Sequence, residues 1–262
     1  MNNRTSCLDP EELVRRYSEG ISAYRLAKDH GCSIWSIITR LRAAGVTIRK
    51  DGVPTQLGLS GDDLKLFQSL VTGILLGDGS VNKVKKFLRL QQAEKRLGWL
   101  QQVKRSFDSM GVRSRIISIS PKFDKTIEGR PVQEQPSFLL YTTVCDEFRE
   151  LRRAWYPNDG VKRIPKDLRL DPVSLTHWMC GDGSRGSPGF TFYTNGFLEE
   201  DVDFLILRLQ EDLGIEARKG THVRQGQSII RIGKVDHARK LADIVRPHMD
   251  DSCLYKLEHI TV

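Results

Sequence analysis

The sequence predicts an α+β protein in which a small helical domain precedes two tandem copies of one mixed unit. Three observations support this class. The segment Gly-Asp-Gly-Ser follows an apolar stretch twice, at residues 77–80 and 181–184. Apolar and polar residues alternate after each copy, which is typical of half-buried strands. Residues 10–48 instead place apolar side chains at helical spacing, so we expect an all-helical segment ahead of both copies.

Length and composition limit the class of protein. The chain has 262 residues, 39% hydrophobic and 28% charged, which indicates one or two folded domains. No apolar run approaches the ~20 residues of a membrane span, and residues 1–7 lack the apolar core of a secretion signal. We therefore expect a protein that is not secreted. It would be a cytoplasmic protein associated with the nucleoid, or one that an organelle or a phage encodes.

The cysteines favour neither a disulfide framework nor a zinc site. Their number is odd and no CxxC pair occurs, so we expect buried, reduced thiols. They are Cys7, Cys32, Cys145, Cys180 and Cys253.

Basic charge is concentrated in two stretches. Lys and Arg number 41 and Asp and Glu 33, a net charge of +8. Residues 1–50 hold 9 basic and 5 acidic side chains, and residues 81–130 hold 13 and 4. This clustering favours a polyanion such as nucleic acid as the partner, although a solvated basic surface has the same composition.

Residues 1–51 are predicted to form three short helices. Asp9 caps the first, Ser22 the second and Ser33 the third, because each precedes an apolar helical pattern. A glycine-containing turn joins the last two helices, as in a helix-turn-helix, whose second helix enters the DNA major groove. The segment resembles the helix-turn-helix domains of recombinases and phage regulators. A protein-contact or purely structural three-helix unit is the alternative.

The outer face of the third helix is the candidate DNA-reading surface. Ile37 and Leu41 face inward on this helix, and a basic arm follows Gly45. The candidate DNA-binding residues of this domain are Trp35, Ser36, Thr39, Arg40, Arg42, Arg49 and Lys50.

A glycine-rich linker at residues 52–61 precedes the two copies, which span residues 62–165 and 166–262. Each copy is predicted to form a helix, two strands, a helix, two strands and a final helix, so the pair should be pseudo-twofold. Matching segments are residues 87–90 with 190–193 and 110–112 with 213–215, both at an offset of 103, and then 138–141 with 229–232 and 146–155 with 236–245.

The two Gly-Asp-Gly turns are the candidate metal site. Gly73 and Gly77 share one helix face, where the missing side chains let a second helix approach closely. Close packing of the motif helices would bring Asp78 and Asp182 together at two negative helix ends. Carboxylates placed in this way favour Mg²⁺ bound jointly with phosphate oxygens. One Asp-Gly is a common turn, so the duplication is what favours a site.

These motifs resemble those of the LAGLIDADG homing endonucleases in their single-chain, two-motif form. The first reads Val-Thr-Gly-Ile-Leu-Leu-Gly-Asp-Gly at residues 71–79, and the second Leu-Thr-His-Trp-Met-Cys-Gly-Asp-Gly at residues 175–183. The resemblance covers residues 64–262 and implies two saddle-shaped antiparallel sheets astride a long DNA site. His177 replaces a glycine of the motif, which predicts a bulkier helix crossing with unchanged chemistry.

The resemblance also implies the chemistry. Two or three Mg²⁺ ions would be shared between Asp78 and Asp182, with the backbone carbonyls of Gly77 and Gly181 as further ligands. Each half would hydrolyse one strand of duplex DNA, giving a staggered break across the minor groove. Lys162 and Lys256 lie in segments similar to those that carry active-site lysines in yeast mitochondrial intron-encoded members. They would polarise water or stabilise the pentacovalent phosphate, and a phosphate clamp or a surface charge is the alternative for each.

Strands and turns of the two copies supply candidate DNA contacts. Alternating strand residues could reach base edges, and the basic first copy could bind phosphates. The base-edge candidates are Arg89, Gln91, Tyr193 and Asn195, and the phosphate candidates are Lys83, Lys85, Lys86, Arg113 and Arg115.

The sequence thus predicts a monomeric, Mg²⁺-dependent endonuclease that cuts double-stranded DNA at a long asymmetric site. Two alternatives stay open. A transcriptional regulator could keep this fold without cleavage, and an intron RNA maturase would bind RNA with the same basic charge. Both motif aspartates are present, which favours the nuclease.

Overall fold

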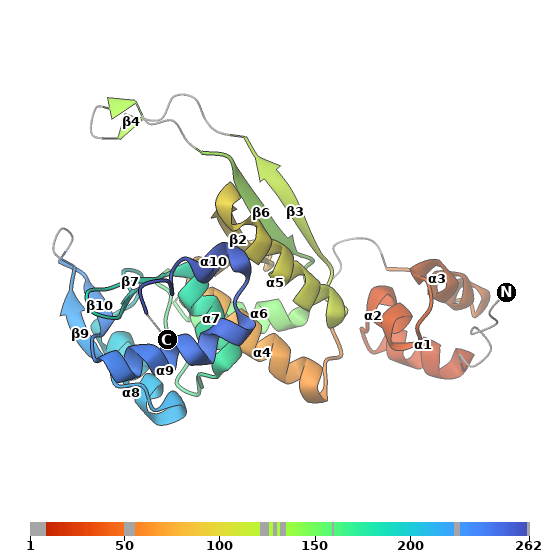
Figure 1. Cartoon of the computed structure of the whole chain (residues 1–262). Coiled ribbons are helices and arrows are strands. Elements are labelled where there is room, and N and C mark those ends of the chain that lie inside the picture. Colours follow the sequence, from red (N-terminus) through yellow and green to blue (C-terminus); the bar gives the residue numbers. More distant parts are fainter. Residues whose placement is uncertain are drawn as a thin grey trace.

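The computed structural model describes residues 9–49, 56–120, 126–127, 130–131, 135–158, 160–222 and 226–260 (Figure 1). The predicted fold class is confirmed. A helical part at the N-terminus precedes two antiparallel four-stranded sheets with their helices. No helix in these ranges is long and apolar enough to cross a membrane. Cys145, Cys180 and Cys253 are buried free thiols as expected, whereas the free thiol of Cys32 is only half-buried, and Cys7 lies outside the described residues.

The N-terminal part is a three-helix unit with a small core of its own. Its helices are α1 (Pro10–Ser18), α2 (Ala23–Asp29) and α3 (Ile34–Ala43). Asp9, Ser22 and Ser33 each cap a helix, because their side chains accept a hydrogen bond from a backbone N–H of its first turn. The fully buried side chains of this core include Leu13, Leu26, Ile37 and Leu41.

The first copy has the predicted element order, with additions. It contains α4 (Gly61–Leu76), β1 (Ser80–Val81), β2 (Leu88–Ala93), the short helix η1 (Glu94–Arg96), α5 (Leu97–Ser109), β3 (Ser114–Ile119), β6 (Ser137–Thr142) and α6 (Asp146–Trp155). The strand order is β1-β2-β6-β3. A second small sheet, β4 (Thr126–Ile127) with β5 (Arg130–Pro131), lies between β3 and β6 in the sequence and was not predicted.

The second copy repeats this topology. It contains α7 (Pro172–Gly181), β7 (Gly183–Arg185), β8 (Phe190–Tyr193), α8 (Glu199–Leu213), β9 (Arg218–Thr221), β10 (Ser228–Ile232), α9 (Val235–Val245), η2 (Arg246–His248) and α10 (Asp251–Leu254). The strand order β7-β8-β10-β9 is equivalent to that of the first sheet. The short helix α10 after α9 is an addition to the predicted unit.

Strand register corrects two predicted matches between the copies. Ser80 pairs with Arg89, and the equivalent Ser184 pairs with Thr191. The β1–β2 connection is therefore two residues longer than the β7–β8 connection, so β2 and β8 match at an offset of 102 and not 103. A shift of one residue moves side chains to the other face of a strand, so Arg89 corresponds to Thr191. Their partners Tyr141 and Arg231 therefore correspond as well, and residues 138–141 match 228–231 and not 229–232.

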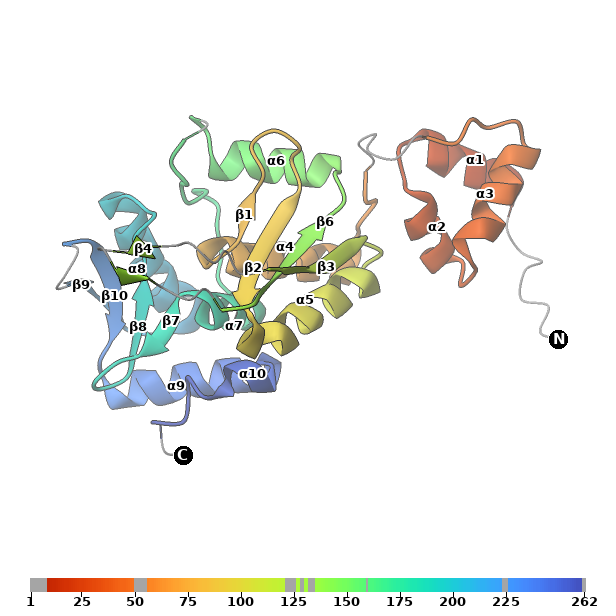
Figure 2. The same ribbon diagram turned by 90° about the horizontal axis from the view of Figure 1, so that it is seen from above.

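The two copies share one core. Buried residues from both belong to a single cluster, which includes Trp99 and Phe107 from the first copy and Trp178 and Phe192 from the second. Helices α4 and α7 pack against each other at the centre. In Figure 2, α7 lies between the two sheets and α4 passes behind β1 and β2. This central pair positions the two Gly-Asp-Gly turns.

Candidate active site

Glycines make the close contact between α4 and α7. A Cβ atom built on Gly73 would lie 2.3 Å from the carbonyl oxygen of Ser174 and 2.8 Å from the Cβ of His177. At the other end of the pair, a Cβ on Gly181 would lie 3.0 Å from the Cα of Gly77. The two backbones are in contact there, so the spacing of Gly73 and Gly77 has the predicted role.

The expected bulk of His177 does not open the helix crossing. Gly73 faces the backbone of α7 and the Cβ of His177, and the imidazole turns toward α5. There Trp99 donates a hydrogen bond from Nε1 to Nδ1 of His177 at 2.9 Å, and the two rings stack. Burial lowers the pKa of His177 to about 4, so the ring is neutral and acts as an acceptor. The prediction of a bulkier crossing is wrong, because the ring leaves the interface.

The close helix ends bring the two motif aspartates together. A Cβ on Gly181 would lie 3.1 Å from the backbone nitrogen of Asp78, and one on Gly77 would lie 3.5 Å from that of Asp182. Burial and the like charge of Asp78 raise the pKa of Asp182 to about 7. In the described part of the chain, the carboxylate of Asp182 has no hydrogen-bond donor. The nearby cations of Lys162, Lys256 and Arg96 offset part of this rise.

Two further residues bind Asp78, and neither was predicted from the sequence. Gln92 donates a hydrogen bond from Nε2 to Asp78 Oδ2 at 2.7 Å, and Arg96 Nη1 lies 3.6 Å from the same oxygen. Arg96 also donates to Gln92 Oε1 at 3.0 Å. One signal was available for Gln92, because it shares a strand face with the buried Leu88 and Leu90 and is therefore a polar residue at a core position.

Lys162 and Lys256 contact backbone carbonyls of the motif turns. Lys162 Nζ donates to the carbonyl oxygens of Leu75 and Gly79 at 2.8 and 2.9 Å, with that of Gly77 at 3.4 Å. Lys256 Nζ lies 2.7 to 3.0 Å from four such oxygens, of Met179, Cys180, Gly181 and Gly183. Burial lowers the pKa of each lysine to about 8.

These contacts place both ammonium groups at the negative ends of the motif helices. An ammonium group has three N–H donors, so the carbonyls around Lys256 engage all of them. Its side chain is only 4% exposed. In this geometry the lysines hold the turns that carry Asp78 and Asp182.

The donor set fits a divalent cation that also binds substrate. Among the described residues, no group of three or more His, Cys, Asp or Glu side chains could form a closed metal site. Two carboxylates are present instead, and the carbonyls of Gly77 and Gly181, the other predicted ligands, accept hydrogen bonds from Lys162 and Lys256. Mg²⁺ commonly takes one or two carboxylates, waters and substrate phosphates. The unpaired carboxylate of Asp182 is the observation that fits this type of ion.

The first sheet exposes three of the predicted DNA-contacting residues on one face. Arg89 pairs with Tyr141, which pairs with Arg115, so these side chains form a row across β2, β6 and β3. Gln91 lies on the same face and donates a hydrogen bond to Ser137. Arg89, Gln91 and Arg115 are exposed, as is Arg113 just before β3. Tyr141 completes the row and was not predicted.

The β1–β2 turn carries the three predicted lysines. Lys83 and Lys85 are exposed, and Asn82 orders the turn by accepting from the backbone N–H groups of Val84 and Lys85. Lys86 is half-buried and donates to the carbonyl of Lys83, so its ammonium group is partly committed to the turn.

The second sheet differs in chemistry. Tyr193 packs edge-on against His222 with ring centroids 5.7 Å apart, and Asn195 is exposed just after β8. Thr191, Arg231 and Arg218 form the row equivalent to Arg89, Tyr141 and Arg115. Both arginines are exposed and were not predicted.

The three-helix unit presents part of the predicted surface. Trp35 is 72% exposed, and Thr39 and Arg42 are exposed on the same face of α3. Ser36 and Arg40 on α3 are half-buried.

The predicted basic arm is only partly described. Arg49 donates to the carbonyl of Tyr17 at 2.7 Å and covers the Tyr17 ring, so it binds α1. Lys50 lies outside the described residues.

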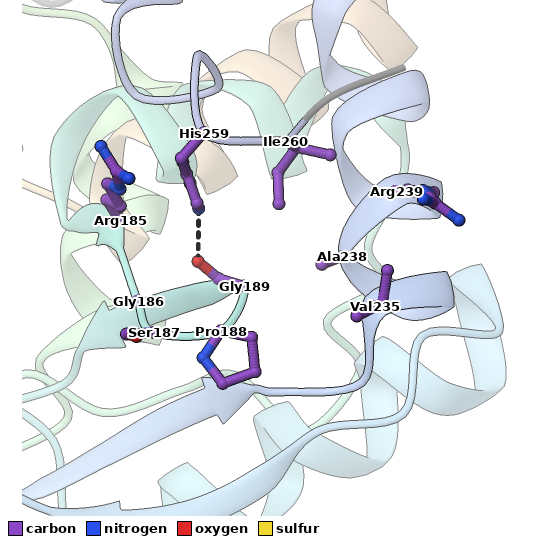
Figure 3. A pocket seen from close by; sticks show the side chains of 10 residues that line it. All are labelled: Arg185, Gly186, Ser187, Pro188, Gly189, Val235, Ala238, Arg239, His259 and Ile260. Atoms are coloured by element: carbon purple, nitrogen blue, oxygen red, sulfur yellow. Dashed lines mark hydrogen bonds between the residues drawn. The ribbon is translucent and has the colours of Figure 1, made fainter.

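A pocket of about 320 Å³ lies apart from the motif turns, between the β7–β8 connection and α9 (Figure 3). His259 points across it and contacts the carbonyl oxygen of Gly189 at 2.7 Å. Arg185 and Arg239 also line it. None of the motif residues does, so this pocket is separate from the candidate active site.

Comparisons with known proteins agree with the fold. A model of the LAGLIDADG DNA endonuclease family matches residues 68–239. An uncharacterized protein of Methanocaldococcus jannaschii is 28% identical over 89% of each chain. The cytochrome b mRNA maturase bI2 of Saccharomyces cerevisiae is 28% identical over 72% of this chain, which spans 46% of the maturase. The solved homing endonuclease I-WcaI, bound to its DNA recognition sequence, superimposes with a TM-score of 0.60 and 21% identity, covering 77% of this chain and 95% of its own.

Proposed function

The chain belongs to the LAGLIDADG DNA endonuclease family, and on this basis we propose that it is a site-specific, Mg²⁺-dependent endonuclease that hydrolyses both strands of a DNA duplex. One chain carries both motifs, so a monomer suffices for two strands. The observation that carries the proposal is the pair of motif aspartates at the contact of α4 and α7, next to two sheets with basic exposed faces.

The residues of the centre have distinct tasks in this proposal. When bound, a divalent cation would polarise the phosphodiester and activate water as the nucleophile. Asp78 and Asp182 would hold it, with the carbonyls of Gly77 and Gly181. Gln92 fixes the orientation of the Asp78 carboxylate, and outer contacts of this kind tune metal ligands.

The lysines act on the backbone in this scheme. Lys162 and Lys256 offset the partial negative charge at the ends of α4 and α7, and their bonds keep each turn in one conformation.

Hydrolysis breaks one phosphorus–oxygen ester bond per strand, with water as the second reactant. Basic residues of the sheet faces would bind the phosphates on either side.

The comparisons support a second candidate function. The yeast relative is an mRNA maturase, and a basic surface can bind RNA as well as DNA. A maturase would need the sheets and their charge but not the metal-binding aspartates. The two candidates therefore predict different effects of substituting Asp78 or Asp182.

The test begins with a random-sequence library of 50-base-pair duplexes, selected by binding to the full chain. The selected duplexes are then incubated with the protein and Mg²⁺. We expect double-strand breaks at one position, and Asp78→Asn or Asp182→Asn should abolish them while the dissociation constant stays within about threefold. Asp243→Asn, at an exposed position on α9, is the matched control and should cut normally.

Other results would reject the proposal. Tight duplex binding without any cleavage, in Mg²⁺ or Mn²⁺, would favour a regulator. Preference for structured intron RNA over duplex, unaffected by both aspartate substitutions, would favour a maturase.

A further inference from the structure

Arg25 joins the three-helix unit to the first copy. Its Nη1 donates to Asp63 Oδ2 at 2.7 Å and to the backbone carbonyl of Met110 at 2.5 Å. Its Nε lies 2.8 Å from Oδ1 of Asp29, which is on its own helix. Only 8% of the residue is exposed. A buried guanidinium shared between α2, α4 and the end of α5 is a costly group to separate from its partners.

The segment between α3 and α4 is also attached to both sides. Gln56 forms a parallel bridge with Ile21 of the three-helix unit. Leu57 is buried in the core of the two copies, and its N–H donates to Glu147 of α6 at 2.6 Å. A Cβ on Gly58 would lie 2.2 Å from Ile21 Cδ1. The unit is thus held by contacts on α2 and directly before α4.

The orientation places α3 on the same side as the open face of the first sheet. Both views show α2 toward the first copy, and Figure 1 shows α3 as the uppermost helix of the unit. Seen from above in Figure 2, β1 and β2 pass in front of α4. Leu88 and Leu90 are buried in the core, and Arg89 and Gln91 are exposed on the opposite face of β2.

We propose that Arg25 fixes the three-helix unit as a rigid extension of the DNA-binding surface, so that α3 binds the major groove of the same duplex at one set distance and helical phase from the cleavage centre. This inference rests on the proposed function. The inference adds a detail to the long asymmetric DNA target. The DNA segment bound by α3 must lie at the end of the target that the first copy binds. A duplex is the partner, since Trp35, Thr39 and Arg42 form an exposed strip that fits a groove.

The test uses duplexes selected from the same library, with Ca²⁺ in place of Mg²⁺ so that binding is measured without cleavage. Footprinting of the full chain and of the double variant Trp35→Ala/Arg42→Ala locates the segment that α3 protects. Five base pairs are then inserted between this segment and the core site, which turns the segment by about half a helical turn. We expect the affinity for the inserted site to fall about tenfold, to the level of the double variant. The loss of one set of base contacts weakens binding by about this factor.

Two variants loosen the connection from opposite sides. Arg25→Met and Asp63→Asn should each reduce the insertion penalty to about threefold or less, because the freed unit can follow the rotated segment. Asp63 belongs to α4, so its substitution leaves the three-helix unit intact. Arg15→Met is the matched control. It breaks ion pairs with Glu12 and Glu19 inside the unit without touching Arg25, Asp29 or the first copy, and it should keep the full penalty.

Several outcomes would overturn this inference. A footprint that does not change in the double variant would show that α3 does not bind DNA. Equal binding of the original and inserted sites by the unmodified protein would show a loose tether. An undiminished penalty in both Arg25→Met and Asp63→Asn would remove Arg25 from the connection. Because none of these readouts requires cleavage, a failure here differs from the failure of the nuclease proposal.

Discussion

Replacing Gly73 by alanine tests whether the contact of α4 with α7 builds the site. The new Cβ would lie 2.3 Å from the Ser174 carbonyl oxygen, well inside the 3.0 Å that real Cβ contacts respect. The colliding atom belongs to the backbone of α7, so the two helices must move apart. Overpacking of this kind costs up to ~3 kcal/mol, and alanine recovers ~1 kcal/mol of helix propensity. The net loss of stability should be about 2 kcal/mol.

Thermal unfolding measures this loss. For a chain of this size 1 kcal/mol corresponds to ~2–4 °C, so the Tm of Gly73→Ala should fall by about 4–8 °C. Cleavage should also slow, because the displaced helices carry Asp78 and Asp182 apart. Gly196→Ala is the control, since a Cβ there meets nothing within 4 Å. A Tm of Gly73→Ala equal to that of Gly196→Ala would refute the close packing of the two motif helices.

Three further predictions concern the residues around the aspartates. Lys256→Met leaves up to four buried carbonyl oxygens without a donor, which should lower the free energy of unfolding in urea by about 3 kcal/mol. Lys166→Met, at an exposed position, should cost nothing measurable. Because the pKa of Asp182 is about 7 and metal ligands must be deprotonated, Mg²⁺ affinity and cleavage should both fall as the pH drops from 8 to 6; an unchanged Mg²⁺ affinity would contradict this. Gln92→Ala should lower cleavage at limiting Mg²⁺ by about tenfold or more, with little change in duplex binding. Gln91→Ala, one position along β2, should leave cleavage chemistry intact, and equal cleavage defects in both variants would exclude a specific role for Gln92.

Local patterns were sufficient to predict the order of elements and the two acids of the centre. Three features depend only on neighbours within a few residues: helix caps such as Ser33, the alternation of apolar and polar residues in strands, and the duplicated turn. Such short-range structure can be predicted from the sequence. The same holds for Gly73 and Gly77, whose spacing places both on one helix face. These features led to the confirmed fold class and to Asp78 and Asp182 as candidates.

Contacts between distant segments could not be predicted in this way. Gln92 and Arg96 bind Asp78 only because β2 ends beside the motif turn, and Lys256 reaches the carbonyls of α7 from the far end of the chain. The ring of His177 points away from the helix crossing because it accepts a hydrogen bond from Trp99. The docking of Arg25 against Asp63 and Met110 likewise joins two separately encoded cores. Periodicity reports which face of an element is buried, whereas the partner of a buried polar group depends on how elements pack, which is decided only in three dimensions.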